Sequence, residues 1–362
     1  MSIFLLIVIL LVLVVAHEFG HFIVAKKSGM RVDEFGFGFP PKLFSIKKGE
    51  TKYSFNLIPF GGFVKIFGEN PDEKDAIDPD SSRAFNNRPK IAQALVLSAG
   101  IVANLLVAWI LFSIGFASGM PASTDAIPKG AIVTNTSLVI LDVEKNSPAQ
   151  VAGLQSGDGI TKLSSSNDEI TTPTPTSLKN FIVSHSDKNI DVIYTRHGTE
   201  NITSVTPVIK KGQPMIGIAM DTIATVRLPI HKAIIAGAVE TAVLSDKIVV
   251  GLGKLIGDAF TGNGSLDDVA GPVGLVGSVG GAYSFGIIYL LSFAAMISVN
   301  LAVINLMPFP ALDGGRLLFL LIEKIKGSPI KPKTANIVNM IGFLILISLM
   351  LLITTHDIFK LF

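Results

Sequence analysis

Four long stretches of this 362-residue chain contain no charged residue, and they limit its possible folds more than any other feature. The stretches cover residues 1–16, 91–124, 269–312 and 337–355. A helix needs about 20 apolar residues to cross the hydrocarbon layer of a membrane. The first stretch reaches that length if its helix continues through residues 17–25. We therefore expect an α-helical multi-pass membrane protein with four transmembrane helices.

The composition supports a membrane protein and argues against several other classes. Only 16% of the residues are charged, whereas soluble domains have about 25%. The chain has 30 Lys and Arg residues against 28 Asp and Glu, a net charge of +2, so no nucleic-acid partner is expected. Cysteine is absent, which leaves His and carboxylate side chains as the strong metal ligands.

Basic residues in the short loops predict the orientation in the cell (inner) membrane. Twelve Lys and Arg side chains lie from Lys26 to Lys90, and four lie between Glu323 and Ala335. The positive-inside rule makes both segments cytoplasmic, and both termini and the long middle region extracytoplasmic. The N-terminal run has no basic residue before it and no small-residue cleavage site after it. We therefore interpret it as a membrane span and not as a cleaved signal peptide.

The segments between the spans differ in character. Alternating side chains and a turn within residues 42–68 predict a β-hairpin, which can enter the membrane as a re-entrant element where protein shields it. Residues 228–260 carry one polar stripe at helical spacing, which predicts an amphipathic helix in the membrane interface or against the neighbouring domain. The expected order is a first transmembrane helix (1–26), a cytoplasmic loop with the hairpin (27–90), a second transmembrane helix (91–120), a β-rich domain (127–223), the amphipathic helix (228–260), a third transmembrane helix (282–322) and a fourth (336–358).

Residues 127–223 contain short β-type runs separated by turn residues. Within them Ser147-Pro-Ala, Ala152-Gly-Leu and Gly157-Asp-Gly-Ile follow one another in an order that resembles bacterial PDZ domains. The resemblance implies a single inserted α+β PDZ-like domain, a type of domain that binds extended peptides by adding a strand to a sheet edge. A β-rich spacer that binds no peptide is the alternative interpretation.

The sequence His17-Glu-Phe-Gly-His21 carries the strongest chemical signal. On a helix, residues four apart share a face, so both imidazoles can reach one zinc ion. The carboxylate of Glu18 can then take a proton from a water molecule that zinc activates. Ionisable residues at the end of a membrane span are costly and are usually functional. A cluster that merely reaches toward the membrane surface is the less favoured interpretation.

A catalytic zinc needs a third protein ligand, and two carboxylates are candidates. Glu34 lies in a Gly- and Pro-rich stretch without a helical setting. Asp313 is the first charge after the stretch 269–312 and follows two prolines, which disrupt a helix and allow its carboxylate to turn inward. The basic loops place His21 and Asp313 at the cytoplasmic ends of their spans. Asp313 is therefore the expected ligand.

Two motifs resemble those of the site-2 protease family of intramembrane zinc metalloproteases. His-Glu-x-x-His begins at His17, and Asn-x-x-Pro-x-Pro-x-Leu-Asp-Gly covers residues 305–314. The likeness includes the bacterial regulator-of-sigma-E protease branch. It implies a Zn2+ site formed by His17, His21 and Asp313, with Glu18 as the general base. The implied substrate-binding residues are Asn305, Pro308, Pro310, Tyr53, Phe55 and Leu57.

The resemblance implies hydrolysis of a peptide bond in the transmembrane segment of a single-pass membrane protein, for example an anti-sigma factor. Another protease is expected to trim the substrate first, with the PDZ-like domain excluding bulky ectodomains. Clearance of remnant signal peptides is an alternative that uses the same residues. A non-catalytic PDZ-bearing membrane scaffold is a third interpretation, although zinc binding alone does not require Glu18. A transporter is not expected, because the spans hold few ionisable residues outside the motifs.

Overall fold

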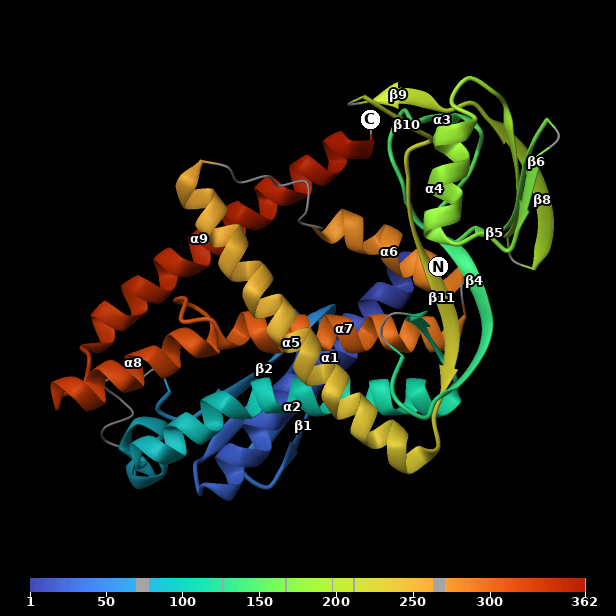
Figure 1. The fold of residues 1–362 in the computed structure, drawn as a ribbon. Coiled ribbons are helices and arrows are strands. Elements are labelled where there is room, and N and C mark those ends of the chain that lie inside the picture. Colours follow the sequence, from blue (N-terminus) through green and yellow to red (C-terminus); the bar gives the residue numbers. More distant parts are fainter. Residues whose placement is uncertain are drawn as a thin grey trace. The chain divides into compact units, whose positions relative to one another are not determined.

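A computed structural model describes residues 1–69, 78–124, 127–166, 168–196, 198–210, 212–262, 271–284 and 286–361. Among these residues, four helices are long and apolar enough to cross a membrane (Figure 1). They are α1 (Ser2–Lys27), α2 (Lys90–Ser118), α7 (Ile287–Leu306) and α9 (Pro332–Leu361). The uncharged stretches thus form long apolar helices, as expected, and the chain is an integral membrane protein.

The chain forms two compact units. The first comprises Met1–Phe112, Gly237–Val279 and Phe293–Phe362, and the second comprises Ser113–Ala236 and Gly280–Ser292. The residues of the two expected motifs all belong to the first unit.

The second unit is built on an antiparallel sheet. In the part of the chain that the structure describes, this sheet has seven strands in the order β3-β11-β4-β5-β7-β8, with β6 beside β5. The strands are β3 (Met120–Ser123), β4 (Ile132–Val143), β5 (Gly159–Ser165), β6 (Asp168–Thr171), β7 (Ile190–Arg196), β8 (Thr199–Val205) and β11 (Ile218–Arg227). The unit also contains the short pair β9 (Val208–Lys210) and β10 (Gln213–Met215), and the helices α3 (Pro148–Val151) and α4 (Pro175–Ser184).

Helix α4 covers the core of this sheet. It begins at a capping box in which Thr174 and Ser177 exchange side-chain and backbone hydrogen bonds, which satisfies donors that a helix start leaves free. Its apolar side chains Leu178 and Phe181 are buried against sheet residues such as Val192. The expectation of a β-rich domain between the second and third apolar helices is confirmed.

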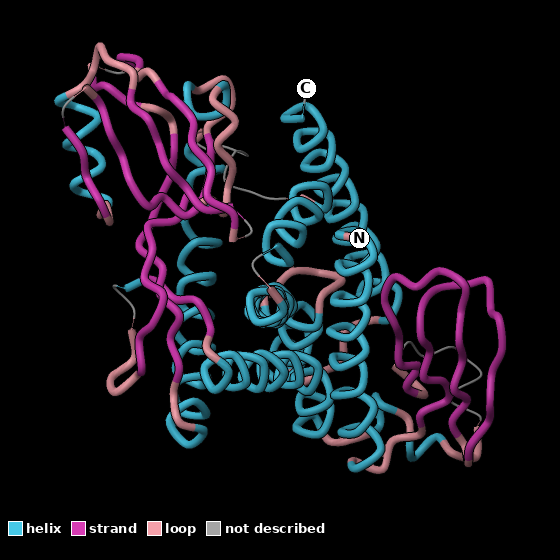
Figure 2. Tube along the Cα trace, turned by 90° about the vertical axis from the view of Figure 1, so that its right-hand side faces the viewer, coloured by secondary structure: helices cyan, strands magenta, loops and turns pink. Residues whose placement is uncertain are grey.

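A separate sheet formed by β1 (Val32–Lys48) and β2 (Thr51–Ile66) lies beside α1 in the first unit (Figure 1). The register pairs residues 34–37 with both 52–55 and 62–65. The long strands therefore bend, and different parts of β2 pair with the same residues of β1. Figure 2 shows their curved trace. The sheet is thus wider than a simple hairpin.

The chain that follows β11 is helical. Helix α5 (Ile230–Thr261) occupies the segment expected to be amphipathic, and α6 (Pro272–Ser284) and α8 (Asp313–Lys326) flank α7. The expected third transmembrane segment, 282–322, accordingly contains the end of α6, all of α7, an irregular stretch and the beginning of α8. The break before α8 falls at the Pro-x-Pro sequence, where two backbone donors are missing.

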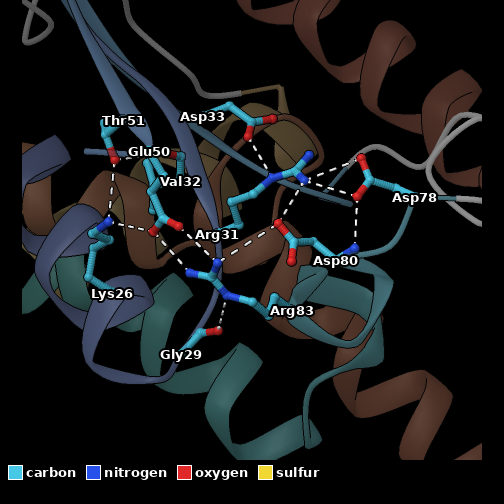
Figure 3. Close-up of polar contacts among 10 residues, drawn as sticks. All are labelled: Lys26, Gly29, Arg31, Val32, Asp33, Glu50, Thr51, Asp78, Asp80 and Arg83. Atoms are coloured by element: carbon cyan, nitrogen blue, oxygen red, sulfur yellow. Dashed lines mark hydrogen bonds and ion pairs between the residues drawn. The ribbon is translucent and has the colours of Figure 1, made fainter. Parts of the chain in front are cut away.

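Charged side chains from three segments meet at the end of α1 (Figure 3). Glu50, in the turn between β1 and β2, accepts a hydrogen bond from Lys26 of α1 at 2.6 Å. The guanidinium of Arg83 donates to both carboxylate oxygens of Glu50 at 2.8 and 2.9 Å. Such a bidentate pair is among the stronger polar contacts in proteins. The turn is thereby fastened to α1 and to the short 3-10 helix Ser81–Arg83.

A second set of contacts continues from this one in Figure 3. Arg31 donates hydrogen bonds to Asp33 at 2.9 Å, to Asp78 at 3.1 and 3.2 Å, and to Asp80 at 3.2 Å. Its guanidinium also lies 3.6 Å above the ring of Phe67. The segments before β1 and before α2 are therefore joined by one network of charges.

We expect Glu50→Gln to lower stability near neutral pH and to flatten the response to acid. Hydrogen bonds from Arg83 and Lys26 lower the pKa of Glu50 from 4.5 to about 2. The resulting stabilisation is complete above the unfolded pKa and is lost as the pH falls toward the folded pKa. Because the groups are partly exposed, we expect the variant to lose ~1 kcal/mol at neutral pH.

Thermal unfolding of the detergent-solubilised protein at about pH 7 and about pH 3 tests this linkage. The difference between parent and variant should shrink at the lower pH. Glu200→Gln, at an exposed position of β8, is the control and should change little at either pH. An equal loss for Glu50→Gln at both pH values would contradict the assignment.

Candidate metal centre

Two histidines of α1 face the same point. His17 and His21 are one helical turn apart and both are buried, and their Nε2 atoms lie 3.1 Å apart. Asp313, the first residue of α8, places its Oδ2 atom 3.0 Å from His17 Nε2 and 3.3 Å from His21 Nε2. The structure therefore brings Asp313 next to two histidines that precede it by nearly 300 positions in the sequence.

The three donor atoms fit a zinc ion. At ligand distances of about 2.0–2.1 Å, two ligands of a tetrahedral zinc lie about 3.3 Å apart, close to the 3.0, 3.1 and 3.3 Å found between these atoms. The buried Oδ2 of Asp313 has no hydrogen-bond partner within the described residues. Two imidazoles and one carboxylate are a donor set that suits zinc and leaves a fourth position for water or substrate.

Helix α2 sets the orientation of His21. The Nδ1 atom of His21 lies 2.7 Å from the carbonyl oxygen of Val96. Because a carbonyl oxygen only accepts, Nδ1 carries the proton and donates it, and the Nε2 lone pair remains available to a metal. The side-chain amide of Asn104, also on α2, occupies the corresponding place beside Nδ1 of His17.

Helix α2 approaches the two imidazoles closely because residue 100 is glycine. A Cβ atom at Gly100 would lie 2.3 Å from Nε2 of His21 and 2.7 Å from Nε2 of His17. On the facing helix, a Cβ atom at Gly20 would lie 2.4 Å from the carbonyl oxygen of Ala99. Any larger side chain at position 100 would therefore collide with the two imidazoles.

The irregular stretch before α8 determines where Asp313 points. Pro308 and Pro310 cannot donate backbone hydrogen bonds to continue α7. Ala311 has a left-handed backbone with φ of 74°, an uncommon conformation for a residue with a side chain. Its N–H group donates to Oδ1 of Asn339 in α9 at 3.2 Å. The carboxylate of Asp313 then lies in the first turn of α8, where the helix dipole favours a negative charge.

Close packing and two ion pairs hold the start of α8 in place. A Cβ atom at Gly314 would lie 2.2 Å from a carbonyl oxygen of α7, so no larger residue fits there without movement. Arg316, one turn after the ligand, pairs with Glu69, which follows β2. Farther along, Glu323 pairs with Lys90 of α2 at 2.5 Å. Helix α8 is thereby tied to both neighbouring segments.

Glu18 lies beside the ligands and lines two cavities. One, of about 250 Å³, is also lined by two of the metal ligands and by Asn305. The other, of about 280 Å³, is lined by all three ligands and by Phe63, Val64 and Ile66 of β2. Open space therefore lies next to the candidate base.

The β-sheet residues expected to bind substrate are not among the described residues that line these cavities. Tyr53 packs on Phe22 of α1 with ring centroids 6.1 Å apart. Phe55 stacks on Phe44 with ring centroids 4.7 Å apart, and Leu57 is exposed. The part of β2 that lines a cavity is its end, ten or more residues beyond Tyr53.

The two prolines expected to bind substrate, and the alternative third ligand, lie outside the lining of the two cavities. Pro308 and Pro310 shape the break before α8 and are not among the described residues that line the two cavities. Glu34, the alternative third ligand, pairs with Lys42 at 3.0 Å. Among the described residues, the cluster that can hold a metal ion at this site consists of the two histidines and Asp313.

Three residues of α2 that shape the site are not predicted by any motif. Val96, Gly100 and Asn104 follow one another at intervals of four, which places them on one helix face. Val96 contributes a backbone carbonyl, Gly100 the absence of a side chain, and Asn104 a side-chain amide. The only sequence signal is a polar Asn inside an apolar span, which is a general indication of function.

The geometry agrees with the comparison to known protein families. The sequence profile of peptidase family M50 matches residues 5–349. The chain belongs to peptidase family M50. The site-2 protease resemblance of its two motifs is thereby confirmed, and the protein is a zinc-dependent protease.

Similar proteins cover nearly the whole chain. The zinc metalloprotease RasP of Bacillus licheniformis is 31% identical over 97% of both chains. The zinc metalloprotease RasP of Geobacillus kaustophilus is 31% identical over 100% of this chain and 98% of its own. The regulator of sigma-W protease RasP of Bacillus subtilis is 29% identical over 97% of this chain and 96% of its own. The likeness therefore includes both the membrane helices and the inserted domain.

We expect Gly100→Ala to weaken zinc binding and to lower stability. Its new methyl group would lie within 2.7 Å of imidazole atoms of both histidines, and overpacking of a tight site commonly costs about 1–3 kcal/mol. Zinc per protein after dialysis against a chelator, together with a thermal melt, measures both effects.

Gly251→Ala is the matched control. Gly251 lies in helix α5 with no heavy atom within 4 Å of an added Cβ, so alanine should leave zinc content unchanged and slightly favour the helix. Normal zinc retention in Gly100→Ala would mean that the close approach of α2 to the ligands is not required.

Proposed function

We propose that this M50 protease hydrolyses a peptide bond within or beside the transmembrane segment of a single-pass membrane protein. The observation that carries the proposal is the position of His17, Glu18 and His21 in the second half of α1, an apolar helix long enough to cross a membrane. A hydrolytic centre on such a helix meets polypeptide that lies in or next to the lipid bilayer.

The ligands and the base have distinct roles in this proposal. His17, His21 and Asp313 hold zinc, which when bound polarises a carbonyl group and lowers the pKa of water. Glu18 takes a proton from the attacking water and later gives it to the leaving amine. Its place on the wall of both cavities supports this role, because a base must be within reach of the water and of the scissile bond.

A substrate helix must unwind before it can be cut, because its carbonyl groups are engaged in its own hydrogen bonds. We assign Asn305 to orient the substrate backbone or the developing oxyanion, a role supported by its place in the cavity that Glu18 lines. A hydrogen bond that only stabilises the helix break is the alternative role. Pro308 and Pro310 keep that break open.

The β1–β2 sheet is proposed to hold the unwound segment by strand addition. Phe63, Val64 and Ile66 would act next to the base, since they line its cavity. Tyr53, Phe55 and Leu57 would contact substrate farther from the scissile bond.

Orientation and substrate choice extend the proposal. Basic residues in the loops support a catalytic site near the cytoplasmic side, with the β-rich domain and both termini outside. We propose that this domain is PDZ-like and excludes bulky ectodomains, so that the substrate must be trimmed first.

The name of the Bacillus subtilis relative connects that protein with sigma-W, and we propose membrane-anchored anti-sigma factors as the substrate class here.

Clearance of remnant signal peptides is the second candidate function. The same ligands and base would serve it, since the reaction is identical and only the substrate differs. Comparing cleavage of a single-span reporter with cleavage of a free signal-peptide segment separates the two.

We expect Glu18→Gln to bind zinc normally and to lose cleavage by at least about 100-fold, the usual contribution of a general base. Asp313→Ala should lose both, because it removes a ligand. Zinc content and cleavage of a single-span reporter in detergent or liposomes measure these outcomes.

Glu240→Gln, a charge loss on α5 away from both cavities, is the control and should retain both properties. Cleavage by Glu18→Gln at the parental rate would rule out the proposed base. Full zinc content in Asp313→Ala would rule out the proposed ligand.

A further inference from the structure

Asn104 is a buried polar residue in an apolar helix. Its side chain is almost fully excluded from solvent, and its amide nitrogen lies 3.3 Å from Nδ1 of His17. The hydroxyl of Ser298 in α7 donates to the backbone oxygen of Asn104 at 2.8 Å. The residue is therefore fixed between two apolar helices and beside a metal ligand.

The chemistry of the histidine decides which amide atom belongs at this contact. His17 directs Nε2 toward His21 and Asp313, so a zinc ion held there would take the lone pair of Nε2, and the proton of the neutral imidazole would be on Nδ1. That Nδ1–H group can only donate a hydrogen bond, and an amide nitrogen cannot accept one.

The amide oxygen is the atom that can accept. Oδ1 of Asn104 is buried and has no hydrogen-bond partner within the described residues. Oxygen and nitrogen of an amide exchange places by a half-turn of the side-chain end, and the hydrogen-bond network decides between the two orientations. A half-turn places Oδ1 against the Nδ1–H group of His17.

We propose that Asn104 is a positioning residue whose side-chain oxygen accepts a hydrogen bond from Nδ1–H of His17 and so holds that imidazole ready for zinc. The proposal rests on the zinc site described above. It parallels the other ligand, because His21 donates in the same way to the carbonyl oxygen of Val96. Val96 and Asn104 lie two turns apart on one face of α2, with Gly100 between them against the imidazoles.

This arrangement has a consequence that can be measured. The acceptor for His21 is backbone and persists in any substitution, whereas the acceptor for His17 is a side chain. Partners of this kind fix the tautomer and ring orientation of a metal-binding histidine, and their loss typically costs 10–100-fold in metal affinity.

The test compares Asn104→Leu with Asn104→Asp in the full-length protein. Leucine has a similar size but no acceptor, and we expect its Kd for zinc to rise by about 10–100-fold. Aspartate keeps an oxygen at the same place and should retain affinity within a few-fold of the parent. Competition with a chromogenic chelator gives the Kd, and the visible spectrum of the Co2+-substituted protein reports the geometry of the site independently of proteolysis.

Asn300→Leu is the matched control, because the side-chain amide of Asn300 donates to the backbone oxygen of Met296 at 3.0 Å in its own helix. It should bind zinc like the parent. A thermal melt of each metal-free variant separates loss of folding from loss of affinity.

Two results would overturn the inference. One is zinc affinity in a folded Asn104→Leu variant within two-fold of the parent, and the other is equal loss in Asn104→Asp and Asn104→Leu. Failure of the parent to bind zinc would instead overturn the metal site itself.

Discussion

The approach of one carboxylate to two imidazoles is the interaction on which the rest of this structure depends. Asp313 Oδ2 lies 3.0 and 3.3 Å from the Nε2 atoms of His17 and His21, although the aspartate lies near the opposite end of the chain. Such a cluster in an apolar environment is costly unless an ion or hydrogen bonds compensate its polar atoms. A zinc ion held by these three residues would provide that compensation, and zinc supplies the chemistry of a protease of this family.

The surrounding helices are arranged to make this approach possible. Helix α2 contributes a carbonyl group, a missing side chain and an amide on one face, and each acts directly on an imidazole. The break before α8 turns the aspartate inward, and the Arg316–Glu69 and Glu323–Lys90 pairs tie α8 to its neighbours. The charged network at the end of α1 fastens the β1–β2 sheet beside the same helix.

The sequence predicts structure and function best where a residue pattern has few alternative explanations. Uncharged stretches indicated the apolar helices, and the spacing of His17 and His21 indicated a shared metal, because both signals are local. Residues 34–37 pairing with two parts of β2 could not be predicted, since that register depends on long-range packing. The roles of Val96 and Gly100 were hidden for the same reason: a backbone carbonyl and a glycine in an apolar helix carry no chemical signature.

X-ray absorption spectroscopy at the zinc edge of the purified protein tests the central claim most directly. The structure predicts one zinc with two imidazole nitrogens and oxygen ligands at about 2.0–2.1 Å, and a changed first shell in Asp313→Ala. A first shell with fewer than two imidazoles, or one that Asp313→Ala leaves unaltered, would contradict the convergence of α1 and α8 on a shared metal.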